Sequence, residues 1–255
     1  MADARPSSPP VLATHGLTRS FGGLVAVRDV SIALHQGELH AVSGPNGAGK
    51  TTLVNMLSGE IRPTAGRIEL NGREVAGEPT WRMTRAGVGR SFQRTNIFPS
   101  LPVLENVRLA VQAVSSAPLR PFQHASSDRG LVDKAHATLQ RVGLGGTADR
   151  LAGALSHGEQ RQLEIAMTLA GDPKVLLLDE PLAGMGPEES ERLTGVLQGL
   201  AREHAVLLIE HDMDFVFAVA DWMTVMAEGT VLAEGKSADI RANTAVQEAY
   251  LGGHA

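Results

Sequence analysis

The sequence contains no cysteine, which excludes disulfide bonds, thiolate metal sites and a cysteine nucleophile. This composition fits a cytoplasmic location. No apolar run approaches the ~20 residues needed to span a bilayer, and residues 1–10 lack the apolar segment of a signal peptide. Any association with a membrane is therefore expected to depend on a partner protein.

Lysines and arginines are scattered rather than clustered, and the formal net charge is −5. Proteins that follow nucleic-acid phosphates usually carry a basic patch, so no nucleic-acid partner is expected. The 255 residues, of which 43% are hydrophobic, are enough to bury a full core. Residues 1–10 are rich in Pro, Ser and Ala and predict a disordered tail. Residues 11–255 then predict one domain.

One glycine-rich segment, Gly44-Pro45-Asn46-Gly47-Ala48-Gly49-Lys50-Thr51-Thr52, fits the pattern G-x-x-x-x-G-K-[ST]. Its glycines allow backbone N–H groups to surround nucleotide phosphates. We expect Lys50 to reach the β and γ phosphates and the Thr51 hydroxyl to bind Mg²⁺. A strand-like run at 40–43 precedes the segment and a helix-like run at 51–57 follows it, as a true phosphate loop requires. The segment predicts binding of ATP or GTP.

Two short apolar runs, 175–178 and 205–209, have the pattern of strands buried on both faces of a parallel sheet. Asp179 follows the first run, and we expect it to bind Mg²⁺ through water. Glu180 comes next and suits a general base that polarises the attacking water. Alternatively, Glu180 caps the next helix or pairs with an arginine. His211 follows the second run at the same sheet edge, where a catalytic and a structural role are equally open.

Ser156 and Glu159 precede a helical pattern and match a capping box, in which both side chains satisfy free N–H groups at a helix start. Gly158 lies in the same first turn, where glycine costs about 1 kcal/mol against alanine. That cost is reasonable if a phosphate must approach the backbone closely, and the helix dipole favours such an anion. We therefore expect anion binding here, with capping alone as the alternative.

The turn and helix patterns in the rest of the sequence predict the fold class. Residues 66–75 indicate a hairpin with a tight Asn71-Gly72 turn. Between about 95 and 170, helical periodicity covers 103–111, 131–142 and 158–169, without a convincing strand. The prediction is an α/β fold: a P-loop NTPase (RecA-like) core with an antiparallel β portion and an α-helical subdomain inserted at about 95–170.

With these motifs in place, the chain resembles the ATP-binding subunits of ABC transporters from about Val11 to Gly253. The resemblance implies that 44–52 is the Walker A motif, that Asp179 is the Walker B aspartate and that Glu180 is the catalytic glutamate. It also implies that ATP and Mg²⁺ are bound. A signature segment beginning at Ser156 is expected to serve the nucleotide of a second cassette.

The same resemblance assigns four residues that the chemistry alone leaves open. Gln93 is similar to the Q-loop residue that senses Mg²⁺ and the membrane subunit, although by itself it would be a surface residue. His211 is similar to the switch histidine at the γ-phosphate. Phe21 looks like the aromatic residue that stacks on adenine, with Ala26 as a small second contact. Without the resemblance, Phe21 would be assigned to the core.

Within the superfamily, the chain resembles the importers of branched-chain amino acids. The segments that carry this likeness are Phe21-Gly22-Gly23, Arg90-Ser91-Phe92-Gln93, 181–185, 209–213 and 248–252. The implied partners are transmembrane permease subunits, a second ATP-binding subunit and, indirectly, a periplasmic binding protein. The implied location is peripheral, on the inner face of the cell membrane.

Several alternatives share the nucleotide motifs. A related importer for urea or another small solute, or a lipopolysaccharide-export ATPase, would carry them too. A soluble ABC ATPase of translation or DNA repair would be expected to show tandem cassettes or a long coiled-coil insert, and the sequence has neither. A GTPase is disfavoured because no Asn-Lys-x-Asp is present. Two departures from the superfamily are Gly186, where an aspartate is usual, and His157, where a glycine is usual.

Overall fold

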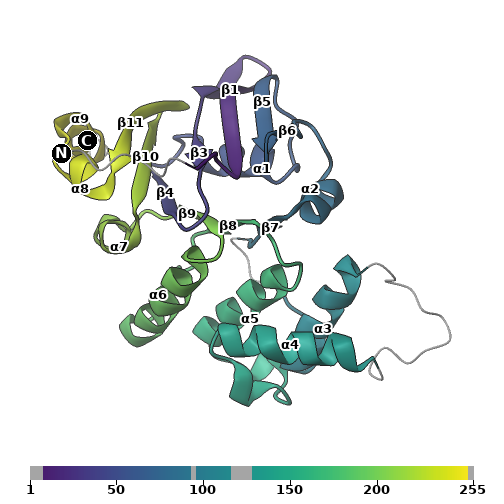
Figure 1. Cartoon of the computed structure of the whole chain (residues 1–255). Helices are drawn as coiled ribbons and strands as arrows, with labels where there is room; N and C mark the ends of the chain where they lie inside the picture. The colour runs from purple at the N-terminus through teal and green to yellow at the C-terminus, as the bar shows by residue number, and fades with distance from the viewer. Residues whose placement is uncertain (1–7, 93–95, 116–127, 252–255) are drawn as a thin grey trace.

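The computed structural model describes residues 8–92, 96–115 and 128–251. It contains a six-stranded, mostly parallel sheet, a five-stranded antiparallel sheet and a separate group of helices (Figure 1). The predicted α/β class with an antiparallel portion is confirmed. Most of the expected N-terminal tail, residues 1–7, lies outside the described residues.

The larger sheet has the strand order β11-β10-β4-β9-β8-β7, and only the β10–β11 pair is antiparallel. Every residue of β4, β8 and β9 is buried, as their continuous apolar sequences predict. The strands are β4 (Leu39–Ser43), β7 (Val88–Arg90), β8 (Val175–Asp179), β9 (Ala205–Ile209), β10 (Trp222–Ala227) and β11 (Thr230–Lys236).

Side-chain alternation along these strands divides the interior into two cores. In β8, Leu176 and Leu178 join the core beneath the helices, whereas Val175 and Leu177 join the core on the opposite face. That second core also contains the buried residues of α1 (Lys50–Leu57) and the inner residues of the antiparallel sheet. Helix α1 is thereby held against the sheet, which fixes the loop that precedes it.

The antiparallel sheet has the order β2-β1-β5-β6, with β3 also paired to β1. Its strands are β1 (Leu12–Phe21), β2 (Leu24–Val30), β3 (Ala33–Leu34), β5 (Ala65–Leu70) and β6 (Arg73–Glu74). The predicted hairpin is β5–β6. Its turn residues Asn71 and Gly72 have φ values of 51° and 72°, as a two-residue hairpin turn requires.

Helices α3, α4 and α5 form a group of their own, away from the antiparallel sheet (Figure 1). They lie in the three ranges where periodicity predicts helices. Within residues 96–115 and 128–170, the only β pairing is one bridge between Pro102 and Leu151. The helices of this region are α2 (Thr80–Ala86), α3 (Val103–Val114), α4 (Arg129–Arg141) and α5 (His157–Leu169), with 3₁₀ turns at Gly145–Thr147 and Ala152–Ala154.

The C-terminal part of the chain completes the helical face of the parallel sheet. Helices α8 and α9 lie beside β11 (Figure 1). The helices are α6 (Pro187–Ala201), α7 (Met213–Val219), α8 (Ser237–Arg241) and α9 (Thr244–Leu251). In the described part of the chain, none of the helices is long and apolar enough to cross a membrane.

Candidate nucleotide site

The glycine-rich loop joins β4 to α1, which is the predicted strand–loop–helix arrangement. Two of its glycines are required by close backbone approaches. A Cβ on Gly44 would lie 2.0 Å from the carbonyl oxygen of Met226, and a Cβ on Gly49 would lie 2.4 Å from that of Ala26. Both glycines also have positive φ values, 145° and 99°. Strands β2 and β10 therefore press against the loop and set its path.

Lys50 begins α1 and bends back over the loop. Its Nζ donates hydrogen bonds to the carbonyl oxygens of Gly44 at 2.7 Å and Pro45 at 3.0 Å. Partial burial lowers the pKa of Lys50, whereas the nearby carboxylates of Glu180 and Asp179 raise it. The ammonium group thus lies between the loop and the acidic end of β8.

The other predicted loop residues differ in exposure. Asn46, Gly47 and Thr51 are exposed, Thr52 is half-buried, and Ala48 is buried. Thr51 lies in the first turn of α1, where its hydroxyl is accessible to a ligand.

Asp179 is the last residue of β8 and is almost fully buried. Burial raises the pKa of its carboxyl group, and the adjacent Glu180 raises it further; Arg90, Lys50 and Arg161 lower it. The guanidinium of Arg90 lies 3.8 Å from Asp179 Oδ2. Arg90 also pairs with Glu60. The sequence motifs did not identify Arg90 as part of this site, although it belongs to the segment before Gln93.

Glu180 adopts a left-handed backbone conformation with φ of 46°. Such a conformation costs a non-glycine residue about 1–3 kcal/mol and is common at functional sites. Its N–H donates to the carbonyl of Ile209 at 3.0 Å, so the end of β9 fixes the turn. Gly186, not Glu180, is the N-cap of the following helix α6, so the capping alternative is wrong.

His211 lies next to Glu180, as expected from the two strand ends. Its Nδ1 is 3.9 Å from Glu180 Oε1 and 3.8 Å from Glu210 Oε2. The imidazole is 65% exposed, which does not fit a buried structural histidine. Glu210 is buried and accepts a hydrogen bond from the Leu182 N–H at 3.1 Å. Glu210 therefore joins the end of β9 to the loop after Glu180, a role that its position between a strand and His211 could have indicated.

The capping box at the start of α5 is confirmed. Ser156 Oγ accepts from the Glu159 N–H at 3.2 Å, and Glu159 Oε2 accepts from the Ser156 N–H at 2.8 Å. Glu159 also pairs with Arg150 at 2.9 Å. Both side chains therefore stabilise the helix start, whatever else they bind.

The space beside Gly158 is taken by a carboxylate of the same chain. A Cβ on Gly158 would lie 2.7 Å from Glu189 Cδ, and Ser156 Oγ donates to Glu189 Oε1 at 2.8 Å. The hydrogen bond from Ser156 lowers the pKa of Glu189. The close approach that glycine allows is thus made by Glu189 of α6, which the sequence motifs did not reveal. This carboxylate lies where the sequence predicts an anion.

Phe21 and Ala26 lie on neighbouring strands of the antiparallel sheet. The Phe21 side chain is 42% exposed, so its assignment to the core is wrong. The Arg19 guanidinium lies 4.5 Å from the centre of its ring, which shows that the ring face accepts a planar cationic group. Ala26 lies beside Gly49 and Gly229. Gln93 lies outside the described residues.

His157 contacts the loop after β8. Its Cε1 lies 3.5 Å from the position that a Cβ on Gly184 would take. The second departure, Gly186, starts α6 without a side-chain cap. His157 therefore lies beside Gly184. Gly186 has no side chain and starts α6 through its backbone alone.

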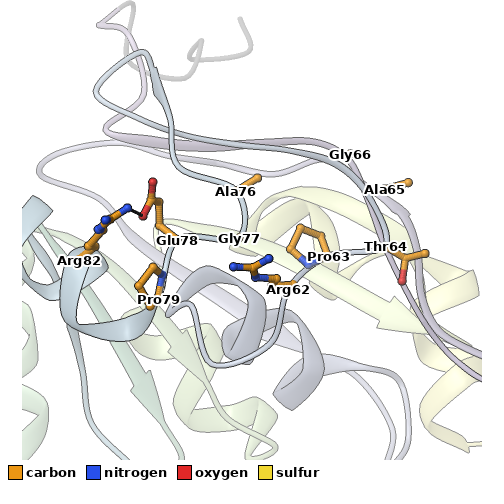
Figure 2. Close-up of a pocket in the computed structure, with 10 residues that line it drawn as sticks. All are labelled: Arg62, Pro63, Thr64, Ala65, Gly66, Ala76, Gly77, Glu78, Pro79 and Arg82. Carbon is orange, nitrogen blue, oxygen red and sulfur yellow. Dashed lines mark hydrogen bonds and ion pairs between the residues drawn. The ribbon is translucent and has the colours of Figure 1, made fainter.

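A separate hollow of about 450 Å³ lies on the antiparallel part of the molecule (Figure 2). Arg82 Nη1 donates to Glu78 Oε2 at 2.8 Å at one end of it. Its lining residues are Arg62, Pro63, Thr64, Ala65, Gly66, Ala76, Gly77, Glu78, Pro79 and Arg82. Because none of these residues belongs to the nucleotide motifs, this hollow is distinct from the candidate nucleotide site.

Comparison with known proteins decides the family. The family model described as ABC transporter matches residues 27–183. The chain belongs to the ABC transporter ATP-binding family. A second model, described as branched-chain amino acid ATP-binding cassette transporter, matches residues 230–255. As an ABC ATPase, the chain binds and hydrolyses ATP.

Relatives of this ABC ATPase match it along nearly their whole length. It is 41% identical to the high-affinity branched-chain amino acid transport ATP-binding protein LivG of Salmonella typhimurium, over 96% of this chain and 99% of the relative. It is 39% identical to the corresponding protein BraF of Pseudomonas aeruginosa, with the same coverage.

Solved structures agree with the fold. The ADP conformation of MJ1267, an ATP-binding cassette of an ABC transporter, superimposes with a TM-score of 0.85 at 28% identity and covers 96% of this chain and 100% of its own. A nucleotide-free cassette from an ABC transporter gives 0.83 at 26% identity, covering 94% and 98%. These neighbours confirm the P-loop NTPase fold.

Proposed function

We propose that this ABC ATPase powers a membrane importer for branched-chain or related amino acids. The observation that carries the proposal is the similarity to LivG and BraF along the whole chain. The match of residues 230–255 to the branched-chain family model supports it from a part of the chain outside the nucleotide motifs. The partners in this proposal are transmembrane permease subunits, with a periplasmic binding protein acting indirectly, and the location is peripheral on the inner face of the membrane.

In this proposal the loop 44–52 holds the phosphates of ATP, and Lys50 exchanges its bonds to loop carbonyls for bonds to phosphate. Glu180 is the general base, and His211 contacts the γ-phosphate from the neighbouring strand end. Phe21 stacks on adenine with Ala26 beside it, and Gln93 couples the site to the permease. The electrostatic interaction of Lys50 with Glu180 and Asp179, and the 3.9 Å between Glu180 Oε1 and His211 Nδ1, support these roles.

Mg²⁺ fits the oxygen donors that the chain offers. An exposed Thr51 hydroxyl and the Asp179 carboxylate are hard oxygen ligands of the kind that Mg²⁺ prefers. No group of three or more His, Asp or Glu side chains suited to a metal occurs among the described residues. We therefore propose that phosphates and water supply most ligands, as is common for this ion. When bound, Mg²⁺ would offset the negative charge of the phosphates.

A second copy or a related cassette would complete the site. Helix α1, which starts at Lys50, and helix α5, which starts after Ser156, lie in separate parts of the molecule (Figure 1). One chain therefore does not bring its own loop and signature segment to one nucleotide. We propose that Ser156, Gly158 and Glu159 serve ATP held on the loop of a second ATP-binding subunit.

Replacing Glu189 with Gln should lower the KM for ATP by about two- to fivefold. The substitution removes the negative charge that competes with the phosphate of ATP for the Ser156 hydroxyl and the N-terminus of α5. The measurement is steady-state ATPase activity against ATP concentration. Glu191→Gln, an exposed carboxylate on the same helix, is the matched control and should leave KM unchanged. A higher KM in Glu189→Gln would mean that Glu189 helps to orient Ser156 for ATP.

The permease contact is expected near Gln93. A pocket of about 290 Å³ lies between α2, β7, α3 and α5, and the neighbours of Gln93 in sequence, Phe92 and Asn96, both line it. Apolar side chains including Ala110, Val114 and Met167 form much of its wall. A largely apolar pocket lined by residues that flank Gln93 in sequence suits insertion of a short segment from the permease.

Replacing Ala110 with Arg should reduce uptake by the assembled transporter at least about tenfold, because a charge would be buried in the proposed contact. The ATPase activity of the isolated subunit should change less than twofold, since Ala110 is distant in sequence from the nucleotide motifs. Ala113→Arg, on an exposed position of the same helix that does not line the pocket, should leave uptake normal. Equal effects of both variants would exclude this contact.

The proposed function is tested by purifying the tagged chain from detergent-solubilised membranes and identifying the proteins that co-purify with it. We expect permease subunits, and uptake of labelled leucine, isoleucine or valine that disappears with Lys50→Ala. Uptake of urea or another solute by the same complex would replace the proposed substrate class. Co-purification of lipopolysaccharide-export proteins would contradict the importer proposal and favour an export ATPase.

A further inference from the structure

The end of the C-terminal helix α9 contacts the strand that leads into the phosphate loop. Tyr250, the only tyrosine of the chain, packs its ring against the helical core. Its hydroxyl lies 2.6 Å from Oγ of Ser43, the last residue of β4. The two residues are 207 positions apart in sequence. The tyrosine thus places the end of α9 beside Ser43, the residue before Gly44.

The hydrogen bonds around this contact form a directed chain. Ser43 Oγ donates its single proton to the carbonyl of Glu210 at 2.8 Å, so it accepts the proton of the Tyr250 hydroxyl. The order is therefore Tyr250 hydroxyl, Ser43 hydroxyl and Glu210 carbonyl. The Ser43 hydroxyl joins the end of α9 to the residue before His211.

Gly44 is held on both sides of its Cα in this arrangement. The carbonyl of Met226 lies against its Cα, which leaves no space for a side chain. Its own carbonyl accepts from Lys50 at 2.7 Å, and the residue before it, Ser43, is held by Tyr250 and Glu210. If Lys50 moves to the phosphates of ATP, as proposed above, the bond to the Gly44 carbonyl is given up. The hydrogen bonds of Ser43 do not involve Lys50 and can remain.

We propose that Tyr250 is a positioning residue for ATP binding, whose hydroxyl holds Ser43, the residue before the loop, in place while Lys50 engages the phosphates. This inference rests on the proposed role of the loop. It gives the C-terminal segment, which matches the branched-chain family model, a part in nucleotide binding. Burial raises the pKa of the Tyr250 hydroxyl, which keeps it protonated and able to donate.

The main test compares Tyr250→Phe with Glu248→Gln, an exposed position of the same helix. Phenylalanine keeps the ring packing and removes only the hydroxyl. We expect the KM for ATP to rise about three- to tenfold, the range for one lost hydrogen bond, with kcat within twofold and a melting temperature without nucleotide that falls by no more than about 5 °C. Glu248→Gln should match the wild type. An unchanged KM in a folded Tyr250→Phe variant would overturn the proposal.

A double-mutant cycle tests the link to Ser43. If the two hydroxyls act in one chain, Ser43→Ala combined with Tyr250→Phe should raise KM no further than the larger single effect. Effects that multiply would show that the two hydroxyls act separately, which contradicts the proposal.

Because Tyr250 is the only tyrosine, labelling with [ζ-¹³C]tyrosine gives one NMR signal. We expect this signal to shift when ATP is added to the Glu180→Gln protein and to shift in Ser43→Ala without nucleotide. If the chemical shift of this signal does not change when ATP is added, the positioning role is overturned, even if Tyr250→Phe does not fold. Failure of the importer proposal would leave these results untouched, because they require only ATP and the isolated subunit.

Discussion

Replacing Glu180 with Gln should cut kcat for ATP hydrolysis by about 10²-fold or more, because a positioned general base is worth roughly that factor. Glutamine keeps the size and hydrogen-bonding shape of the side chain but does not accept a proton. The left-handed turn is held by the Ile209 carbonyl through the backbone and should survive. ATP binding should stay close to normal, because the loop and Lys50 are intact.

The measurements are kcat at saturating Mg-ATP and the Kd for ATP by equilibrium titration. Glu74→Gln, which removes an exposed carboxylate from the edge strand β6, controls for the change in net charge and should be fully active. Turnover near that of the wild type in Glu180→Gln would remove Glu180 from the role of base. Loss of ATP binding would instead point to a role in the charge balance around Lys50.

The second large effect is restoration of activity in a mixed dimer. Lys50→Ala removes the ammonium group at the loop, and Ser156→Arg disrupts the signature segment, so each protein alone should be nearly inactive. In a two-fold symmetric dimer of the two variants, one site collects both defects and the other has an intact loop facing an intact signature. Mixed dimers isolated with two affinity tags should therefore show up to about half of the wild-type activity per dimer.

The control places both substitutions on one chain and pairs that chain with the wild type. Each site of this dimer then contains one defect, so activity should stay near zero although the same side chains are present. Because Ser156 is also the N-cap of α5, its loss costs about 0.5–2 kcal/mol, and melting temperatures must show that the variant is folded. Activity in the control but not in the mixed dimer would mean that each chain works alone. Inactivity of both would mean that the two sites must act together or that a different subunit is the native partner.

Local patterns were sufficient for the fold class and for most of the site. Continuous apolar runs predicted β8 and β9 because strands buried on both faces need apolar residues at every position. Asn71-Gly72 predicted the β5–β6 turn because both residues tolerate positive φ. The three helices between 96 and 170 followed from their periodicity. Features set by neighbours in sequence were thus predictable.

Exposure and long-range contact were less predictable. Phe21 would be assigned to the core by residue type, yet it lies at the end of β1 and is exposed. The β10–β11 hairpin was not predicted, because its strands mix apolar and polar residues without a strong turn pattern. Capping by Glu180 was an open alternative until the structure placed the start of α6 at Gly186.

The sequence by itself determined that this protein binds a nucleotide, because the phosphate loop is a local motif, and the resemblance carried by its motifs indicated an ABC cassette. The tertiary structure alone decided how these parts are held. The left-handed turn at Glu180, the carboxylate of Glu189 beside Gly158 and the hydroxyl of Tyr250 beside Ser43 each depend on segments far apart in sequence. Such contacts arise only when helices and strands pack against one another, because packing fixes side chains that no local pattern brings together.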